Sequence, residues 1–401
     1  MKISRLILLL LVGLSLRAAY AWRFPQWGPG GSIPDINCYE TLAESLLQYG
    51  RLSDPSGHPT AVREPGYPLL LAGLYHITGP SYRAAQALNC LLGAATLILI
   101  FLIGAAVFGR PTAWIATAIA ALYPQFIFYA GTLERETFQT FLLTGGLWLL
   151  IRACRAPSAG RFVSAAAVWA LCPLTNSVFL PAGLAAAGAV WWRGQRRGAG
   201  LFLAVFLGIY ALWPLRNHHV FGRWGTGMSG SGAHLYVGLL IPNDVAGTPE
   251  ELVIDKSDPV MLQASRLPEA ERDRFFYRAA ADFLVRHPFA SAGTFLGSGL
   301  KMWRLYPYPR PYAHDYRLIF WLSLLSDGWI IPLGLLGLFW AGRRYPETDI
   351  FNATLLSVTV VYMLFWAIIR YRLPLMPIVI LYAAHALDHW MPEKYRIAVH
   401  G

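Results

Sequence analysis

The sequence predicts an all-α polytopic membrane protein. Of its 401 residues, 56% are hydrophobic and only 14% are charged, whereas about 25% of a typical soluble domain is charged. The apolar residues form long, nearly uncharged runs, and about 20 such residues make a helix that crosses a bilayer roughly 30 Å thick. The four cysteines lie far apart without CxxC spacing and indicate no disulfide framework. A soluble multi-domain protein is therefore excluded.

Ten segments are expected to span the membrane, and segment 289–306 is a weaker candidate that would raise the number to about 11. The apolar stretch 162–192 is interrupted near Pro173 and Pro181, so we expect a helical hairpin there. A signal peptide is the rival interpretation of the first segment, because Ala19-Tyr20-Ala21 resembles a cleavage site. The expected spans are 3–20, 82–108, 112–130, 137–152, 162–177, 178–192, 199–214, 318–340, 350–369 and 374–390.

The distribution of charge predicts the topology. The formal net charge is +11, and most of the basic residues lie in short connections that the positive-inside rule places in the cytoplasm. The carboxylates in these connections are only Glu347, Asp349, Asp388 and Glu393. Two segments on the opposite, outer side are too long to be turns, residues 22–81 and 215–317. We therefore expect one membrane domain over residues 1–401, with membrane lipids and no nucleic acid as partners.

The first outer segment is expected to contain two interfacial helices. Apolar residues such as Leu42 and Leu46 repeat at helical spacing within residues 40–49, which is typical of a helix lying on a membrane surface. A second short helix is expected over residues 69–78. Asp35 precedes the first helix, so it is either a cap that accepts from free backbone N–H groups or a functional carboxylate.

Two further polar groups adjoin expected membrane segments. The sequence Arg63-Glu64-Pro65-Gly66-Tyr67-Pro68 forms a rigid corner, and its Arg-Glu pair is either a surface ion pair or part of a site. Glu134 and Glu136 lie just before a span. They either complement the positive N-terminus of that helix, or Glu136 faces Asp35 across a cavity.

The turn Arg370-Tyr371-Arg372 contradicts the positive-inside pattern, because it places two cations on the outer side. No carboxylate lies nearby in the sequence, so the two arginines are expected to require an anionic partner. In the second outer segment, residues 268–287 form an expected amphipathic helix with apolar Phe275, Phe276 and Phe283.

These pieces, in this order, resemble the GT-C membrane glycosyltransferases, and more narrowly bacterial members of glycosyltransferase family 39, the protein O-mannosyltransferase and aminoarabinose-transferase relatives. The resemblance covers about residues 1–390 and implies a GT-C fold with 10–11 transmembrane helices. Many relatives have an Asp-Glu pair where Ile36 follows Asp35 here, which weakens a metal assignment. The matching pieces are Asp35-(x)3-Tyr39, residues 63–68, Leu133-Glu134-Arg135-Glu136-Thr137, Trp213-Pro214-Leu215-Arg216-Asn217 with Val220-Phe221-Gly222, and Arg370-Tyr371-Arg372-Leu373-Pro374-Leu375.

The resemblance implies transfer of a hexose or pentose from a polyprenyl-phosphate donor to a protein, lipid or glycan of the envelope, at the outer face of the bacterial inner membrane. Asp35 would be the base of an inverting displacement, and Glu136 would orient the acceptor or the base. The arginines are phosphate ligands or, alternatively, interfacial anchors. No cofactor is expected to be required, and a divalent metal is the open alternative. The substrate-contacting candidates are Tyr39, Arg63, Glu64, Glu134, Arg216, Asn217, Arg370 and Arg372.

Two other functions are compatible with the topology. A lipid-linked saccharide flippase would need a polar path, so charge pairs inside the membrane would favour it. A non-catalytic membrane scaffold would tolerate Asp35→Ala without loss of sugar transfer.

Overall fold

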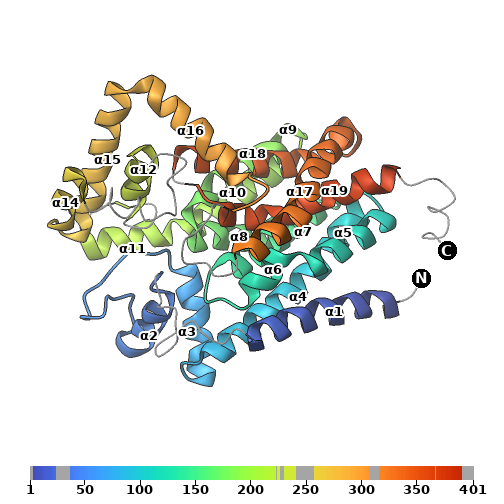
Figure 1. Cartoon of the computed structure of the whole chain (residues 1–401), viewed down its shortest axis with the longest axis horizontal. Helices are drawn as coiled ribbons and strands as arrows, with labels where there is room; N and C mark the ends of the chain where they lie inside the picture. The colour runs from blue at the N-terminus through green and yellow to red at the C-terminus, as the bar shows by residue number, and fades with distance from the viewer. Residues whose placement is uncertain are drawn as a thin grey trace.

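The computed structural model describes residues 3–23, 37–222, 224–225, 230–240, 257–307, 316–365 and 367–390. This part of the chain is helical, with one isolated β-bridge between Ser53 and Pro59 and no strand (Figure 1). The expected all-α membrane fold is confirmed. Asp35, the expected base, lies outside the described residues.

Helices cover most of the described residues in every segment expected to span the membrane. Five helices are long and apolar enough to cross a bilayer, α1, α4, α7, α10 with its continuation α11, and α17. Helices α5 and α6 pass the same test of length and composition together, with a bend of 53° at the break between them, and α8, α9 and α18 are shorter apolar helices. The bounds are α1 Ile3–Arg23, α4 Tyr82–Val107, α5 Arg110–Leu122, α6 Pro124–Ala130, α7 Glu136–Arg155, α8 Ala159–Thr175, α9 Leu180–Trp192, α10 Arg196–Tyr210, α11 Leu212–Phe221, α17 Tyr316–Ala341, α18 Thr348–Leu364 and α19 Met376–Trp390.

The break between α5 and α6 has a clear chemical cause. Pro124 has no N–H group, so it cannot donate to the carbonyl oxygen of Ala120 four residues earlier. The buried Arg17 of α1 supplies the missing donors, through Nη2 to Ala120 O at 3.2 Å and Nη1 to Ala121 O at 3.3 Å. Both Nη atoms of this arginine within a membrane helix thus donate to backbone oxygens of a neighbouring helix, and Nη1 also donates to Gly13 O of α1 at 2.8 Å.

Helix α19 forms the centre of the bundle, because its residues from Met376 to Ala386 are buried on every side. Its backbone touches α17 so closely that an added Cβ at Gly337 would lie 1.9 Å from the carbonyl oxygen of Tyr382. Only glycine permits this approach. Between α18 and α19 the chain forms a 3-10 segment, η3 (Ile369–Leu375), which carries Arg370 and Arg372.

The outer segments contain the expected short helices. In the first, α2 spans Tyr39–Tyr49 and α3 spans Gly66–Thr78; in the second are α12 (Ser231–Leu240), α14 (Pro259–Ser265), α15 (Glu269–Arg286) and α16 (Pro288–Met302). The expected amphipathic helix over 268–287 is α15, and its apolar face packs with Tyr236 and Leu239 of α12 in a small separate core. The weaker candidate over 289–306 is the helix α16, of 15 residues.

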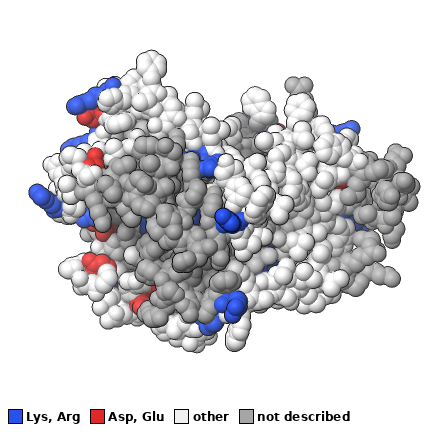
Figure 2. Space-filling view, in the orientation of Figure 1, with Lys and Arg blue, Asp and Glu red and all other residues white. Residues whose placement is uncertain are grey.

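Helix α2 begins directly after Cys38, whose backbone is in the left-handed conformation at φ 58° and whose side chain makes no capping hydrogen bond. Because Asp35 lies outside the described residues, its capping role and its functional role both stay predictions. On the face drawn in Figure 2, most of the acidic atoms lie at the end that carries α14 and α15, while the body toward the chain termini is mainly uncharged.

Candidate functional site

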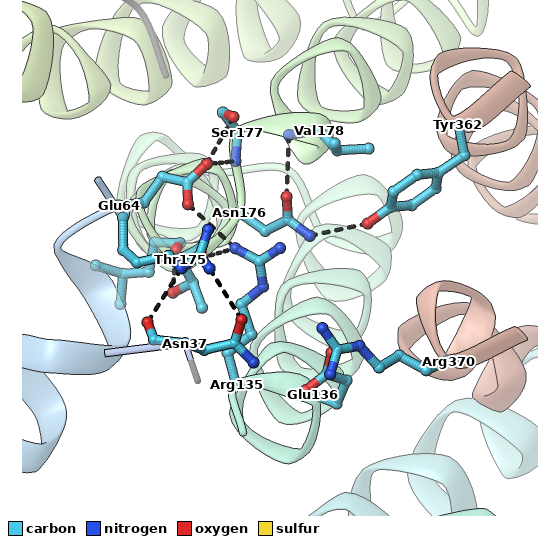
Figure 3. Close-up of polar contacts among 12 residues, drawn as sticks. Asn37, Glu64, Arg135, Glu136, Thr175, Asn176, Ser177, Val178, Tyr362 and Arg370 are labelled. Carbon is cyan, nitrogen blue, oxygen red and sulfur yellow. Dashed lines mark hydrogen bonds and ion pairs between the residues drawn. The ribbon is translucent and has the colours of Figure 1, made fainter. Parts of the chain in front are cut away.

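Glu64 is the buried centre of a polar cluster at the end of the bundle that carries α2 and α3 (Figure 3). It is 2% exposed. Its Oε2 pairs with Arg135 Nη1 at 3.1 Å, and its Oε1 accepts from the backbone N–H and hydroxyl of Ser177 at 2.9 and 2.7 Å. A buried carboxylate requires such partners. The surface ion pair considered for Arg63 and Glu64 is therefore not formed, because the two neighbours bind different partners.

Arg63 instead holds the chain at the start of α2. Its Nε donates to the backbone oxygen of Asn37 at 3.1 Å, and its Nη2 donates to the side-chain oxygen of Asn37 at 2.9 Å. The Asn37 amide donates in turn to Glu134 Oε1 at 2.6 Å. Asn37 follows Asp35 by two residues in the sequence, so the cluster includes the described residue nearest to the expected base.

Arg135 crosses the space between the first outer segment and the hairpin of α8 and α9. Besides Glu64, its Nη1 contacts the backbone oxygen of Thr175 at 3.3 Å. The next residue, Asn176, donates to the hydroxyl of Tyr362 at 2.9 Å, and the Tyr362 ring stacks on that of Tyr371 at 4.8 Å. These contacts join the hairpin, α18 and η3 into one side of the site.

Arg370 reaches from η3 to both glutamates that precede and begin α7. Its Nη1 lies 3.1 Å from Glu134 Oε1 and its Nε lies 3.2 Å from Glu136 Oε1 (Figure 3). The Arg370 side chain is 27% exposed, whereas the two carboxylates are almost fully buried. Burial first, and then the Glu136 carboxylate, raise the pKa of Glu134 to about 7, while Arg370 acts in the opposite direction.

Arg372 has a different environment. It is 0% exposed and its Nη2 lies 2.5 Å from Asp327 Oδ2, which is also fully buried. Asp327 accepts two further hydrogen bonds, from the Tyr123 hydroxyl at 2.6 Å and the Gln125 amide at 2.8 Å. The anionic partner expected for Arg372 is therefore a carboxylate of the chain itself.

Asp327 was missed by the sequence analysis, although one signal was present. It is a lone carboxylate in the apolar span 318–340, and carboxylates within a membrane are usually paired. Arg372 also donates to the backbone oxygens of Met302, at 2.9 Å, and Arg304. The pair thus joins the end of α16 to η3 and α17.

Arg216 and Asn217 lie elsewhere, against the first outer segment. Arg216 donates to the backbone oxygens of Thr60 at 3.0 Å and Leu52 at 3.4 Å, and its guanidinium lies over the Trp213 ring. The Asn217 amide donates to the backbone oxygen of Gly225 at 3.3 Å. Arg216 therefore positions the loop that leads to Arg63, and Asn217 Oδ1 holds Arg216 by accepting from its Nη1 at 3.0 Å.

Tyr39 packs edge-on against Tyr67 of α3, with ring centroids 5.1 Å apart. It is buried beside Arg63, Arg135 and the two glutamates, and burial raises its pKa well above the usual range. Within the part of the chain that the structure describes, no group of three or more His, Cys, Asp or Glu side chains has a metal-binding arrangement.

The comparisons identify the fold. The chain is similar to the archaeal oligosaccharyltransferase AglB from Archaeoglobus fulgidus, in complex with an inhibitory peptide and a dolichol-phosphate, with a TM-score of 0.60 and 16% identity over 98% of this chain and 51% of that one. An oligosaccharyltransferase from Archaeoglobus fulgidus in the apo form gives a TM-score of 0.59, with 16% identity over 98% of this chain and 51% of that one. A further similarity is to ArnT from Cupriavidus metallidurans bound to undecaprenyl phosphate, with a TM-score of 0.42 and 14% identity over 96% of this chain and 78% of that one.

This protein is a polytopic membrane protein with the GT-C fold, and the resemblance inferred from its sequence is confirmed. Its residues 58–215 match the family described as dolichyl-phosphate-mannose-protein mannosyltransferase. The chain spans about half the length of the archaeal oligosaccharyltransferase. No curated protein matches its sequence.

Proposed function

We propose that this protein is a glycosyltransferase that moves a sugar from a polyprenyl-phosphate donor to an acceptor of the cell envelope. The observation that carries the proposal is the meeting of three arginines and three glutamates from separate parts of the chain. These residues are Arg63, Glu64, Glu134, Arg135, Glu136 and Arg370. The GT-C fold and the family match over residues 58–215 support this reading.

The roles follow from the chemistry that such a transfer needs. A sugar on a lipid phosphate already has a good leaving group, so the enzyme must supply a base for the acceptor hydroxyl and cations for the departing phosphate. Asp35 is the proposed base of an inverting displacement. Arg370 is the proposed phosphate ligand, because its guanidinium is partly exposed beside Asn37 and the glutamates. Glu136 would orient the acceptor.

The other predicted substrate contacts divide into two groups. Both carboxylate oxygens of Glu64 and both Nη atoms of Arg372 are bound by other groups of the chain, so we assign these two residues to positioning rather than to substrate. Arg63, Tyr39 and Glu134 line the space around Asn37 and remain proposed contacts. Arg216 would act through the loop that it binds, and Asn217 would act through Arg216.

The test is release of polyprenyl phosphate from a radiolabelled donor by purified protein supplied with its own membranes as acceptor. Asp35→Asn should reduce the rate about 100-fold or more, as expected for loss of a general base. The matched control is Glu44→Gln, an exposed carboxylate on α2, which should retain the rate. Equal rates for Asp35→Asn and the control would reject the base assignment.

One feature of the structure is of the kind that would favour a flippase, the charge pair of Asp327 and Arg372 inside the bundle. Both side chains are 0% exposed and hydrogen-bonded, so they do not line a polar path in this conformation. A flippase would move the lipid-linked saccharide across proteoliposomes without hydrolysing its phosphate bond, and that result would replace the proposed transfer.

A further inference from the structure

The guanidinium of Arg370 is shared by two carboxylates whose hydrogen bonding is incomplete. One oxygen of each glutamate faces Arg370, while Glu134 Oε2 and Glu136 Oε2 are buried and have no hydrogen-bond partner among the described residues. An ionised carboxylate oxygen left buried without a donor is costly. A proton on one of the two glutamates would remove part of that cost.

The geometry favours one proton on this pair of glutamates, because two buried carboxylates share the single guanidinium of Arg370. Asn37 and Arg370 both donate to Glu134 Oε1 and favour its ionised form, whereas burial and the Glu136 carboxylate favour its protonated form. The balance raises the pKa of Glu134 to about 7. The groups that face Glu134 from the surrounding elements are Asn37, Tyr39, Tyr67, Arg135, Glu136 and Arg370.

The charge of the cluster depends on that proton. With all six groups ionised, the three arginines and three glutamates sum to zero. Protonation of Glu134 leaves an excess of one positive charge beside the exposed edge of Arg370. His234 of α12 adds none at neutral pH, because burial and then the neighbouring arginines lower its pKa to about 4. Protonation of Glu134 raises the net charge of the site by one unit, so an anion is bound more strongly by the protonated form than by the ionised one.

Resting on the proposed function, we propose that Glu134 takes up a proton when the donor's phosphate binds to Arg370. The ligand class is a phosphodiester that carries a single negative charge, as in a sugar joined to a polyprenyl phosphate. No bond of the donor is made or broken in this step. A proton moves from solvent to a Glu134 oxygen, and the anion is then held by a guanidinium with one charged carboxylate beside it instead of two.

The thermodynamic linkage between proton binding and donor binding gives the size of the pH dependence. If Glu134 is half protonated at pH 7 and fully protonated in the complex, binding takes up about half a proton per site at that pH. The dissociation constant should then be nearly constant below pH 6 and rise about fivefold between pH 7 and pH 8.

The experiment measures binding of farnesyl methyl phosphodiester to the purified full-length protein by titration calorimetry from pH 6 to 8.5. This probe has no ionisation in that range, whereas a phosphomonoester titrates near pH 6. At pH 7, two buffers of different ionisation enthalpy report proton uptake directly on the wild-type protein. This measurement stands even if a variant fails to fold.

Substitutions then identify the residue that takes up the proton. Glu134→Gln should bind with a pH-independent affinity, at least as tightly at pH 8 as the wild type does at pH 6. Asp282→Asn, which removes an exposed carboxylate of α15, should keep the wild-type slope. A slope that persists in Glu134→Gln but disappears in His234→Gln would assign the proton to α12 and overturn the proposal, as would a slope that chelation of divalent metal abolishes.

The failure of this proposal is distinguishable from failure of the proposed function. Binding without proton uptake rejects the role of Glu134 but leaves the donor class intact. Absence of binding at every pH rejects both.

Discussion

Breaking the ion pair between Asp327 and Arg372 should destabilise the protein strongly. Both side chains are 0% exposed, and removing one member of a buried pair typically costs about 3–5 kcal/mol because the remaining charge has no compensation. Asp327→Asn keeps one oxygen that can accept from Tyr123, but its amide would point N–H groups toward a guanidinium. We therefore expect a loss near 3 kcal/mol for this variant.

Arg372→Leu should cost a similar amount, because it removes the donors to the backbone oxygens of Met302 and Arg304 as well as the charge opposite Asp327. The two losses should not add. The double variant Asp327→Asn with Arg372→Leu should be about 2–3 kcal/mol less damaging than the sum of the single variants, which is within the usual range for residues in contact.

The assay is a double-mutant cycle of unfolding free energies in mixed detergent micelles. The exposed pair Asp282 and Arg286, four residues apart on α15, supplies the control, and its Asp282→Asn variant should change stability by no more than about 0.5 kcal/mol. Additive losses at Asp327 and Arg372, or losses as small as the control, would refute the reasoning. The surviving single variants should also bind donor more weakly, because Arg370 lies two residues from Arg372.

Three further predictions concern accessibility, packing and pH. Cys38 is the one cysteine of the four that is not buried, so a membrane-impermeant maleimide should label the wild-type protein there from the outer side, and labelling only after permeabilisation would invert the topology. Gly337→Ala should cost at least about 1–3 kcal/mol in thermal stability, since its Cβ would meet the backbone of α19 at 1.9 Å, whereas Gly208→Ala, with open space around it, should not destabilise α10. Burial raises the pKa of Asp273 to about 6 although its carboxylate accepts from the Gly232 N–H at 2.6 Å. Because the folded-state value is raised, its contribution is present below about pH 4 and is lost as the pH rises through 6, so hydrogen exchange of α12 should be better protected at pH 5 than at pH 8, and Asp273→Asn should abolish the difference.

The helices could be predicted from the sequence because the bilayer determines the length and polarity of a segment that crosses it. The runs at 82–108 and 318–340 have few alternatives to a membrane helix, and the repeat of phenylalanines in 268–287 allows little but an amphipathic one. The order of Asp35, residues 63–68, Glu134 and Arg370 was also sufficient to indicate the fold. The first two share one outer segment, and an even number of expected spans separates that segment from Glu134 and Glu134 from Arg370.

The partners within the site could not be predicted in the same way. Arg63 and Glu64 are neighbours in sequence, yet one binds Asn37 and the other binds Arg135 and Ser177. The orientation of Glu64 depends on elements more than 70 residues away, and that of Arg63 depends on the chain at Asn37, 26 residues earlier. Asp327 shows the same limit, because its apolar surroundings predict that it is paired but not that its partner is Arg372, 45 residues later.

Arg17 and Pro124 are dependent on each other although 107 positions separate them in the printed sequence. Because Pro124 has no amide hydrogen, the Ala120 carbonyl oxygen lacks its usual helical donor, and the Arg17 guanidinium donates to it from the adjacent helix. We expect neither residue to be tolerated alone. Arginine beside an unbroken helix would be a buried charge without hydrogen-bond acceptors, and a broken helix beside leucine would leave backbone carbonyl oxygens without a donor. Homologues should therefore exchange both residues together, and a homologue that has lost only one should show a compensating polar side chain at this depth.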